Sequence, residues 1–273
     1  MLLRVLTLCT VAVLAQLYGL SSSVGLVRVF SNGTQAAMGI PIPHELQAQN
    51  LAAMDSVRGI YYFVGFDQQV QQAQLVGVSL ATGAVSSTVP LPFAEMSFVG
   101  VGQYMAFASD LNLVVLSGQT ADQTHLVITI SPATGVYKRV CEITHADLDV
   151  LGGSASYVPT AQLFVFNLGY GGFIGNFVVS LKTGKFVNVT NTAQGNVESM
   201  VFNPKDRLVY GLGLQIEGEA WNRTIVSFDP VSLKFAQRGV VAGFGIESGG
   251  ISAIDVASQT LFWIGMKAPY VPK

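Results

Sequence analysis

The stretch LVGVSLATGAVSSTVPLP, residues Leu75 to Pro92, decides the fold because it reads as an apolar strand, a turn of small residues and a second strand. Related copies begin at Leu26, Ile128 and Val178, and a weaker copy begins at Ile225. The turn positions recur every 49 to 52 residues, at Gly33, Gly83, Gly135, Gly184 and Leu233. Glycine suits a tight hairpin that needs positive φ. Leu233 therefore predicts that the fifth turn is of another type.

A second unit lies between these hairpins, and it consists of an apolar strand, a short polar gap and a very apolar strand. Its five copies end in YYFVG (Tyr61 to Gly65), LVVLSG (Leu113 to Gly118), LFVFN (Leu163 to Asn167), LVYGL (Leu208 to Leu212) and LFWIG (Leu261 to Gly265). Each period thus holds four short strands, A-B and then C-D, and repeats of this length and content are typical of propeller blades. The pattern predicts an all-β protein.

The two ends of the chain decide the number of blades. The chain opens on a C-D hairpin, Leu26 to Pro43, and closes on an A-B pair, Ile251 to Gly265. Joined, these two halves make one blade beside four uninterrupted ones. The prediction is a five-bladed β-propeller of four-stranded blades, whose ring is closed by pairing of the N-terminal C-D hairpin with the C-terminal A-B strands. A piece of a six- or seven-bladed propeller is the alternative.

The first 20 residues resemble a secretory signal peptide. Arg4 precedes a short apolar run from Val5 to Leu14, and small and polar residues follow. This run is shorter than the roughly 20 residues that a membrane-spanning helix needs. We expect cleavage near residue 15 or 23, a single propeller domain over residues 24–273, and a secreted, extracellular protein.

The composition agrees with blades that are apolar on both faces. Half of the residues are hydrophobic, 11% are charged and the mean hydropathy is +0.48. Later segments of the length of a membrane span are interrupted by Gly, Pro or polar residues, so the sequence predicts no membrane span after signal removal. The net charge is −2 and the basic residues are scattered, which argues against a nucleic-acid partner. We expect a monomer.

The chain resembles the broad NHL, YVTN and quinoprotein-like group of propellers. The resemblance rests on the four-strand blade, on the Thr-Gly turns at Gly83, Gly135 and Gly184, and on the step from Asp255 to Leu261. It implies an architecture and no particular activity, because such folds host lectins, hydrolases, oxidoreductases and scaffolds.

Acidic residues recur once per blade in the D-to-A connections. In propellers these connections and the B-to-C loops gather on the face where ligands bind. The five acids are Glu45, Glu95, Asp147, Glu198 and Glu247. One hypothesis is a carboxylate ring that binds sugar hydroxyls, a cationic ligand or calcium, with Glu95, Glu198 and Glu247 as the metal ligands. The alternative is that each acid caps the start of strand A as a feature of the repeat.

Aromatic residues in the B-to-C loops could serve as flat platforms for a sugar ring. The third and fourth loops, GYGGFIGN and IEGEAWNR, contain Tyr170, Phe173 and Trp221. The alternative is that these side chains fold back over the blade edge.

Histidine and cysteine offer little sign of catalysis. His44 and His145 flank two of the acids and His125 ends a B-to-C loop, but a transition-metal site needs three or four convergent ligands. Cys9 lies in the predicted signal peptide, and we expect Cys141 to be a buried, unreactive thiol. The sequence has no G-x-S-x-G, H-E-x-x-H or C-x-x-C motif.

The sequence therefore favours a secreted binding protein that recognises a glycan or a protein through the face built by the D-to-A and B-to-C loops. A propeller-type glycoside hydrolase, which needs two carboxylates at a defined separation, and a structural scaffold are the alternatives. Asn32, Asn188 and Asn222 begin glycosylation sequons. We expect no cofactor other than, in the cation hypothesis, calcium.

Overall fold

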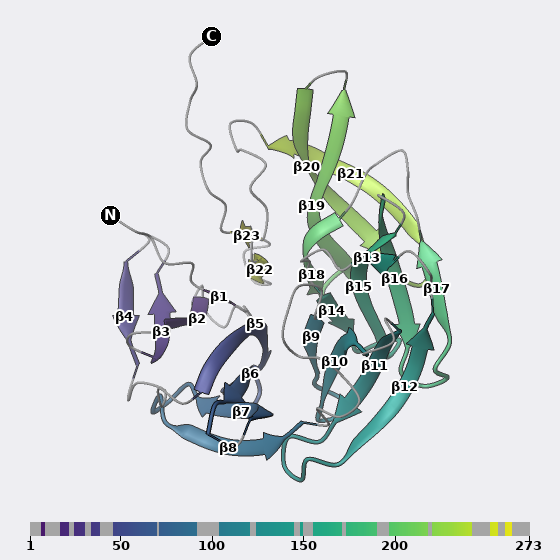
Figure 1. Ribbon diagram of the computed structural model, residues 1–273. Helices are drawn as coiled ribbons and strands as arrows, with labels where there is room; N and C mark the ends of the chain where they lie inside the picture. Colours follow the sequence, from purple (N-terminus) through teal and green to yellow (C-terminus); the bar gives the residue numbers. More distant parts are fainter. Residues whose placement is uncertain are drawn as a thin grey trace. The chain divides into compact units, whose positions relative to one another are not determined.

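A computed structural model describes residues 7–8, 17–21, 25–30, 34–38, 46–69, 71–91, 104–120, 124–144, 148–149, 155–170, 173–189, 197–217, 220–241, 252–255 and 260–263. All regular structure in these ranges is β-strand (Figure 1). They contain no helix long and apolar enough to cross a membrane. The chain divides into two compact units, Met1–Thr144 and His145–Lys273.

The first unit contains three antiparallel sheets, each made by strands in chain order. The first comprises β1 (Thr7–Leu8), β2 (Leu17–Ser21), β3 (Gly25–Val29) and β4 (Gln35–Ala37). The second comprises β5 (Leu46–Asp55), β6 (Ile60–Asp67), β7 (Gln72–Ser79) and β8 (Val85–Pro90). The third comprises β9 (Tyr104–Ala108), β10 (Leu113–Gln119), β11 (His125–Ile130) and β12 (Tyr137–Ile143).

The second unit also contains three antiparallel sheets. The first comprises β13 (Leu148–Asp149), β14 (Ala155–Val158), β15 (Leu163–Tyr170), β16 (Phe173–Ser180) and β17 (Phe186–Val189), with β13 and β14 both paired to β15. The next comprises β18 (Val197–Asn203), β19 (Leu208–Glu217), β20 (Ala220–Asp229) and β21 (Lys234–Val241). The last comprises β22 (Ser252–Asp255) and β23 (Thr260–Trp263).

The repeat predicted from the sequence is confirmed strand by strand. Every C-D hairpin is present, from β3–β4 to β20–β21, and every A-B pair is present, from β5–β6 to β22–β23. Five sheets have at least four strands, in agreement with five four-stranded blades. Apolar residues occur at successive positions of the inner strands, because those strands are buried on both faces.

Among the described residues, the N-terminal C-D hairpin pairs with a strand close to it in the chain, whereas the predicted closing partner is the C-terminal A-B pair. The hairpin β3–β4 pairs with β2, through Leu20↔Leu26 and its neighbours, and β22 and β23 pair with each other. Strand β2 overlaps the stretch, residues 1–20, that is expected to be a signal peptide. It is separated from β3 by three residues, so this hairpin closes with far less loss of chain entropy than a pairing across the whole sequence.

The C-D turns explain why glycine recurs in the repeat. Gly83, Gly135 and Gly184 have φ of +69°, +73° and +71°, the left-handed region in which glycine carries no steric penalty. Leu233 also has positive φ, at +59°. It ends a four-residue connection between paired residues Asp229 and Lys234. The prediction of a different turn type at Leu233 is therefore wrong with respect to the backbone.

Hydrogen bonds to Asp229 stabilise the turn that contains Leu233. Its Oδ1 accepts hydrogen bonds from the amides of Val231 at 2.9 Å and Ser232 at 3.3 Å. The Ser232 hydroxyl donates to Oδ2 at 2.6 Å, and this bond holds the pKa of Asp229 below its ordinary value. Leu233 also packs against the core of the second unit. These contacts offset the strain of a side chain in the left-handed region.

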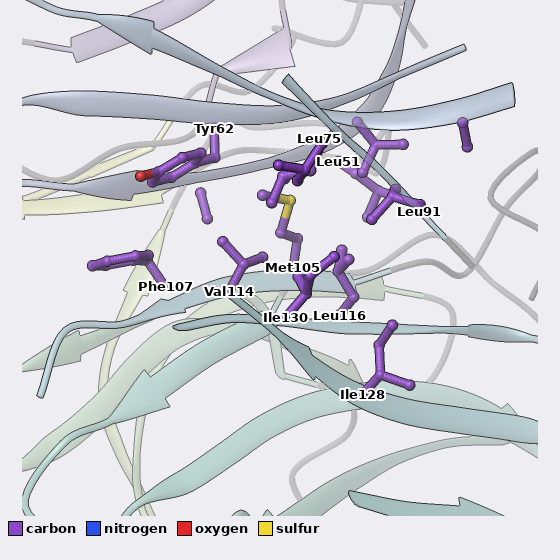
Figure 2. Packing of buried hydrophobic residues seen from close by; sticks show 14 of the residues in the cluster. Leu51, Tyr62, Leu75, Leu91, Met105, Phe107, Val114, Leu116, Ile128 and Ile130 are labelled. Carbon is purple, nitrogen blue, oxygen red and sulfur yellow. The ribbon is translucent and has the colours of Figure 1, made fainter. Parts of the chain in front are cut away.

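In the first unit, sheets β5–β8 and β9–β12 pack face to face through an aliphatic core (Figure 2). Leu75 from one sheet and Leu116 from the other are both fully buried, and each such side chain contributes roughly 1.5–3 kcal/mol. Tyr62 stacks on Phe107 with ring centroids 5.6 Å apart. A complementary apolar surface of this kind explains the high hydropathy of the chain.

In the second unit, sheet β13–β17 packs on sheet β18–β21 in the same way. Val165 and Val178 from the first sheet lie in one buried cluster with Val209 and Phe228 from the second. Residues two positions away along the same strands, Asn167 and Asn176, face the same side because side chains alternate in a strand. This placement brings two amides into an otherwise apolar contact.

Candidate functional site

The D-to-A connections and the B-to-C hairpins end at the same edge of a sheet. Leu46, at the start of β5, pairs with Asp67, and Leu148, at the start of β13, pairs with Tyr170. Asp67 and Tyr170 are the last residues of strands β6 and β15. Within single sheets, the two kinds of connection therefore lie together as the sequence predicts.

Of the five predicted ring acids, the structure describes the strand position of one. Glu198 lies on β18 opposite Leu212, at a shift in the register between β18 and β19. Its neighbour Ser199 has φ of +53°. The other four acids lie outside the described residues: Glu45, Glu95, Asp147 and Glu247. The carboxylate ring and its calcium thus stay predictions.

The three predicted aromatic residues lie on strands rather than in open loops. Tyr170 ends β15 and pairs with Phe173 at the start of β16, so only two residues connect the strands. Trp221 lies on β20 opposite Ile216. The prediction of eight-residue loops here is wrong, because residues 171–172 and 218–219 suffice to connect long hairpins. The role of the aromatics as sugar platforms stays a prediction.

Asn167 links the B-to-C hairpin of its sheet to the next sheet. Its side-chain amide donates a hydrogen bond of 2.6 Å to the backbone carbonyl of Val197, the first residue of β18. Asn167 is buried. The link fixes the start of β18, immediately before Glu198, against the strand that leads to Tyr170.

Asn176 lies opposite Asn167 on the neighbouring strand β16. Its side chain is 1% exposed, and both amide atoms lack a hydrogen-bond partner among the described residues. A buried amide in this condition is rare in folded proteins. The amide pair Asn167–Asn176, together with the carbonyl of Val197, is the candidate site of the second unit.

The amide pair departs from the repeat. In three other sheets, the residue four positions before the C-D turn is equivalent to Asn176, and its partner on strand B is equivalent to Asn167. These pairs are Val64↔Leu75, Ser117↔Val127 and Leu212↔Ile225. Most of these residues are aliphatic. Sequence reasoning missed the amide pair because the copies were compared for their turns, although the same alignment shows two Asn where the copy around Leu75 has Val and Leu.

A second group of polar side chains lies on one face of sheet β9–β12. Tyr104 pairs with Ser117, and the Tyr104 ring lies 6.2 Å from the His125 ring. All three residues are buried. Burial lowers the pKa of His125 to about 4 and raises that of Tyr104. His125 is thus a neutral residue of β11 at physiological pH and not a loop residue.

The remaining metal and thiol candidates show no convergent site. No group of three or more His, Cys, Asp or Glu side chains that could hold a metal ion occurs among the residues described, and His44 and His145 lie outside them. Cys141 on β12 is half-buried rather than fully buried as predicted. Burial raises its pKa to about 12, with a further contribution from Glu142, so its thiol is a poor nucleophile at neutral pH.

The three predicted glycosylation sites fall on different parts of the chain. Asn188 lies on β17 and Asn222 on β20, opposite Phe177 and Gln215 respectively. Asn32 lies outside the described residues. Their modification stays a prediction.

Known proteins resemble this chain in fold and not in sequence. No protein-family model and no curated protein sequence matches it. Among solved structures, a putative TolB from Agrobacterium tumefaciens shares 13% identity over 96% of this chain and 90% of its own, with a TM-score of 0.64. An oligogalacturonate lyase in complex with manganese shares 12% identity over 90% of this chain and 69% of its own, with a TM-score of 0.56. A chain of a nidogen/laminin complex shares 8% identity over 85% of this chain and 78% of its own, with a TM-score of 0.56.

These similarities and the repeated antiparallel sheets define the chain as a β-propeller protein. The propeller resemblance inferred from the Thr-Gly turns is thereby confirmed at the level of architecture. At identities of 8–13%, the neighbours establish the fold alone.

Proposed function

We propose that this propeller is a secreted binding protein that recognises a glycan or a protein through the edge where the D-to-A connections and the B-to-C hairpins meet. Recognition, on this proposal, uses the end of hairpin β15–β16 and the start of β18. Tyr170 and Phe173 supply apolar area, and Glu198 supplies a hydrogen-bond acceptor or a negative charge.

The observation that carries the proposal is the hydrogen bond of 2.6 Å from Asn167 to the carbonyl of Val197. It fixes the strand of Tyr170 to the strand of Glu198 at the edge where ligands of propellers bind. A binding site whose supporting elements are held rigidly loses less entropy when the ligand binds. At the position of Asn167, two other copies of the repeat have the aliphatic residues Val64 and Leu212, so the polar link is particular to this sheet.

The neighbours in fold support binding as a class of function. One is a chain of a complex between nidogen and laminin, and another is a lyase named for oligogalacturonate. The same architecture thus serves protein recognition and carbohydrate recognition. For this chain, the absence of a catalytic motif in the sequence favours recognition over turnover.

A glycan array probed with the purified protein tests the proposal directly. We expect saturable binding to a defined group of glycans, or, if the ligand is a protein, no glycan signal and a specific partner in cross-linking of intact cells. Release of shortened sugars from a bound glycan would instead show a glycoside hydrolase. Absence of both glycan and protein binding would contradict the proposal.

Paired variants locate the binding edge. The double variant Tyr170→Ala/Phe173→Ala should weaken binding about tenfold or more, since each aromatic contact contributes roughly 1 kcal/mol. The matched control is Tyr137→Ala on the outer strand β12, where Tyr137 is partly exposed. The control should bind like the unaltered protein. Equal losses in both variants would place the ligand elsewhere.

A further inference from the structure

Asn176 is a buried polar side chain that the fold does not satisfy. A neutral amide carries two N–H donors and a carbonyl oxygen with two acceptor positions. Asn176 is 1% exposed, and neither its Nδ2 nor its Oδ1 has a hydrogen-bond partner within the described ranges. Some group that satisfies both must therefore lie next to it.

The described side chains that share this face of β15 and β16 carry no charge that could accompany a bare ion. Across the pair lies Asn167, an uncharged amide whose Nδ2 is oriented by its bond to Val197. The neighbours along the same face, Val165 and Val178, are aliphatic members of the buried cluster. A cation would satisfy only Oδ1 and an anion only Nδ2. A small neutral molecule that both donates and accepts satisfies both atoms.

We propose that the pair Asn167–Asn176 binds a buried water molecule between sheets β13–β17 and β18–β21. The water accepts a hydrogen bond from Nδ2 of Asn176 and donates one to its Oδ1, so that one molecule satisfies both atoms. Internal waters are typical where otherwise unsatisfied polar groups are buried, and they bind in sites with two to four polar partners. This site is independent of the proposed function, since a protein with no external ligand could also contain it.

The same repeat position carries a second example in the first unit. Ser117 is the equivalent of Asn167, is fully buried, and its hydroxyl oxygen lacks a hydrogen-bond partner in the described part of the chain. The aliphatic pair Val64↔Leu75 at that position lies in a purely apolar cluster. Polar atoms without partners in the described part of the chain thus occur at this repeat position where a polar residue replaces an aliphatic one.

The test compares the protein with the variant Asn176→Leu, which places in β16 the residue that β7 has at the same position. Water-¹⁷O magnetic relaxation dispersion counts the water molecules that stay bound for longer than the tumbling time. We expect this count to fall by at least one in Asn176→Leu. A high-resolution crystal structure should show density for a water within hydrogen-bonding distance of Asn176 in the unaltered protein and none in the variant.

A second variant keeps the test decisive if Asn176→Leu fails to fold. Asn167→Val/Asn176→Leu restores the complete aliphatic pair of β6 and β7, and we expect the same loss of a bound water. The control Thr183→Ala alters an exposed turn of the same sheet and should leave the water count unchanged. An unchanged count in both Asn176 variants, or a crystal structure in which protein groups alone satisfy the Asn176 amide, would overturn the proposal.

Discussion

Sheets β5–β8 and β13–β17 fill one position of the repeat with opposite chemistry. In the first, Val64 and Leu75 face each other and pack into the aliphatic core; in the second, Asn167 and Asn176 face each other and one of them bonds to the next sheet. All four side chains are at most 2% exposed. The same backbone position thus accommodates an aliphatic pair or an amide pair. The amides are therefore particular to sheet β13–β17 and are not a feature of the repeat.

Comparing the two sheets distinguishes residues that the repeat requires for packing from residues that are particular to one sheet. A fold built of repeats is stabilised when each sheet buries apolar area against the next. An aliphatic pair contributes to that burial, whereas an amide pair is desolvated and must recover its hydrogen bonds. The hydrogen bond from Asn167 to Val197 connects the amide pair to the start of β18.

The largest effect on stability is expected when an amide replaces an aliphatic side chain of sheet β5–β8. Leu75→Asn should lower the free energy of unfolding by about 4 kcal/mol, because it removes a buried Leu and adds an amide without a partner. Urea denaturation measures the loss. Leu75→Met, which keeps the volume, should lose less than about 1.5 kcal/mol. If Leu75→Asn is as stable as Leu75→Met, the apolar core of Figure 2 accommodates amides and the comparison fails.

The next effect concerns sheet β9–β12, where His125 is a buried titratable side chain. Because burial lowers the pKa of His125 to about 4 from 6.5, the unfolded chain binds a proton between pH 6.5 and 4 that the folded protein does not. Stability from this residue is complete above pH 6.5 and falls as the pH decreases to 4. The loss is as much as about 3 kcal/mol. Thermal unfolding as a function of pH measures it.

The variant His125→Leu provides the control for this pH dependence. It removes the titrating group, and the steep part of the profile between pH 6.5 and 4 should become shallower than in the unaltered protein. An identical profile in His125→Leu would assign the acid sensitivity to other residues.

A smaller effect on stability is expected when the hydrogen bond from Asn167 to Val197 is removed and an aliphatic pair is then introduced in its place. Asn167→Val should lower stability by roughly 2 kcal/mol, since it leaves the buried carbonyl of Val197 without its donor. Adding Asn176→Leu should recover part of that loss, because the restored aliphatic pair no longer requires solvation. Chemical denaturation of the single and double variants measures the difference. A double variant less stable than Asn167→Val would contradict the equivalence of the two sheets.

The smallest effects on stability are expected from substitutions in one C-D turn of each unit. Gly135→Ala should lower stability by about 1 kcal/mol, because φ of +73° disfavours a side chain while the added Cβ meets only an ordinary contact with Val89 at 3.5 Å. Leu233→Gly relieves strain at φ of +59° but loses packing against the core, so its change should be near zero. Differential scanning calorimetry measures the stability change of each variant. A clear stabilisation by Leu233→Gly would show that the packing of Leu233 contributes little.

The strands and their pairing could be predicted from the sequence because they are local. Alternating small turns and apolar runs specify each hairpin, and the left-handed φ of Gly83, Gly135 and Gly184 follows from the same residues. The turn at Leu233 could not be predicted, because the hydrogen bonds of Asp229 and the packing of Leu233 substitute for glycine. At the edge of β3, a nearby strand, β2, competes with the distant C-terminal strands, and the sequence pattern does not decide between them.

The candidate site was less accessible to sequence reasoning than the fold. Spacing indicated the acids, but spacing gives no direction for a side chain, and Glu198 alone has a described strand position. Asn167 and Asn176 lie at ordinary strand positions with no recognisable motif. The hydrogen-bond acceptor of Asn167, the carbonyl of Val197, lies on β18, thirty residues further along the chain. Only the packing of one sheet on another reveals such a contact.

The outer strand β17 has a consequence for the behaviour of the protein at high concentration. The outer strands β8, β12 and β21 each carry a register shift against their neighbours, and each contains a proline or basic residues. Strand β17 has four regular pairs, and its Phe186 and Val187 are 39% and 46% exposed. An outer strand that is regular and apolar is a template on which a second chain can add a strand. We therefore expect β17 to be one of the strands at which a second chain can add, and the sequon at Asn188 lies on that same strand.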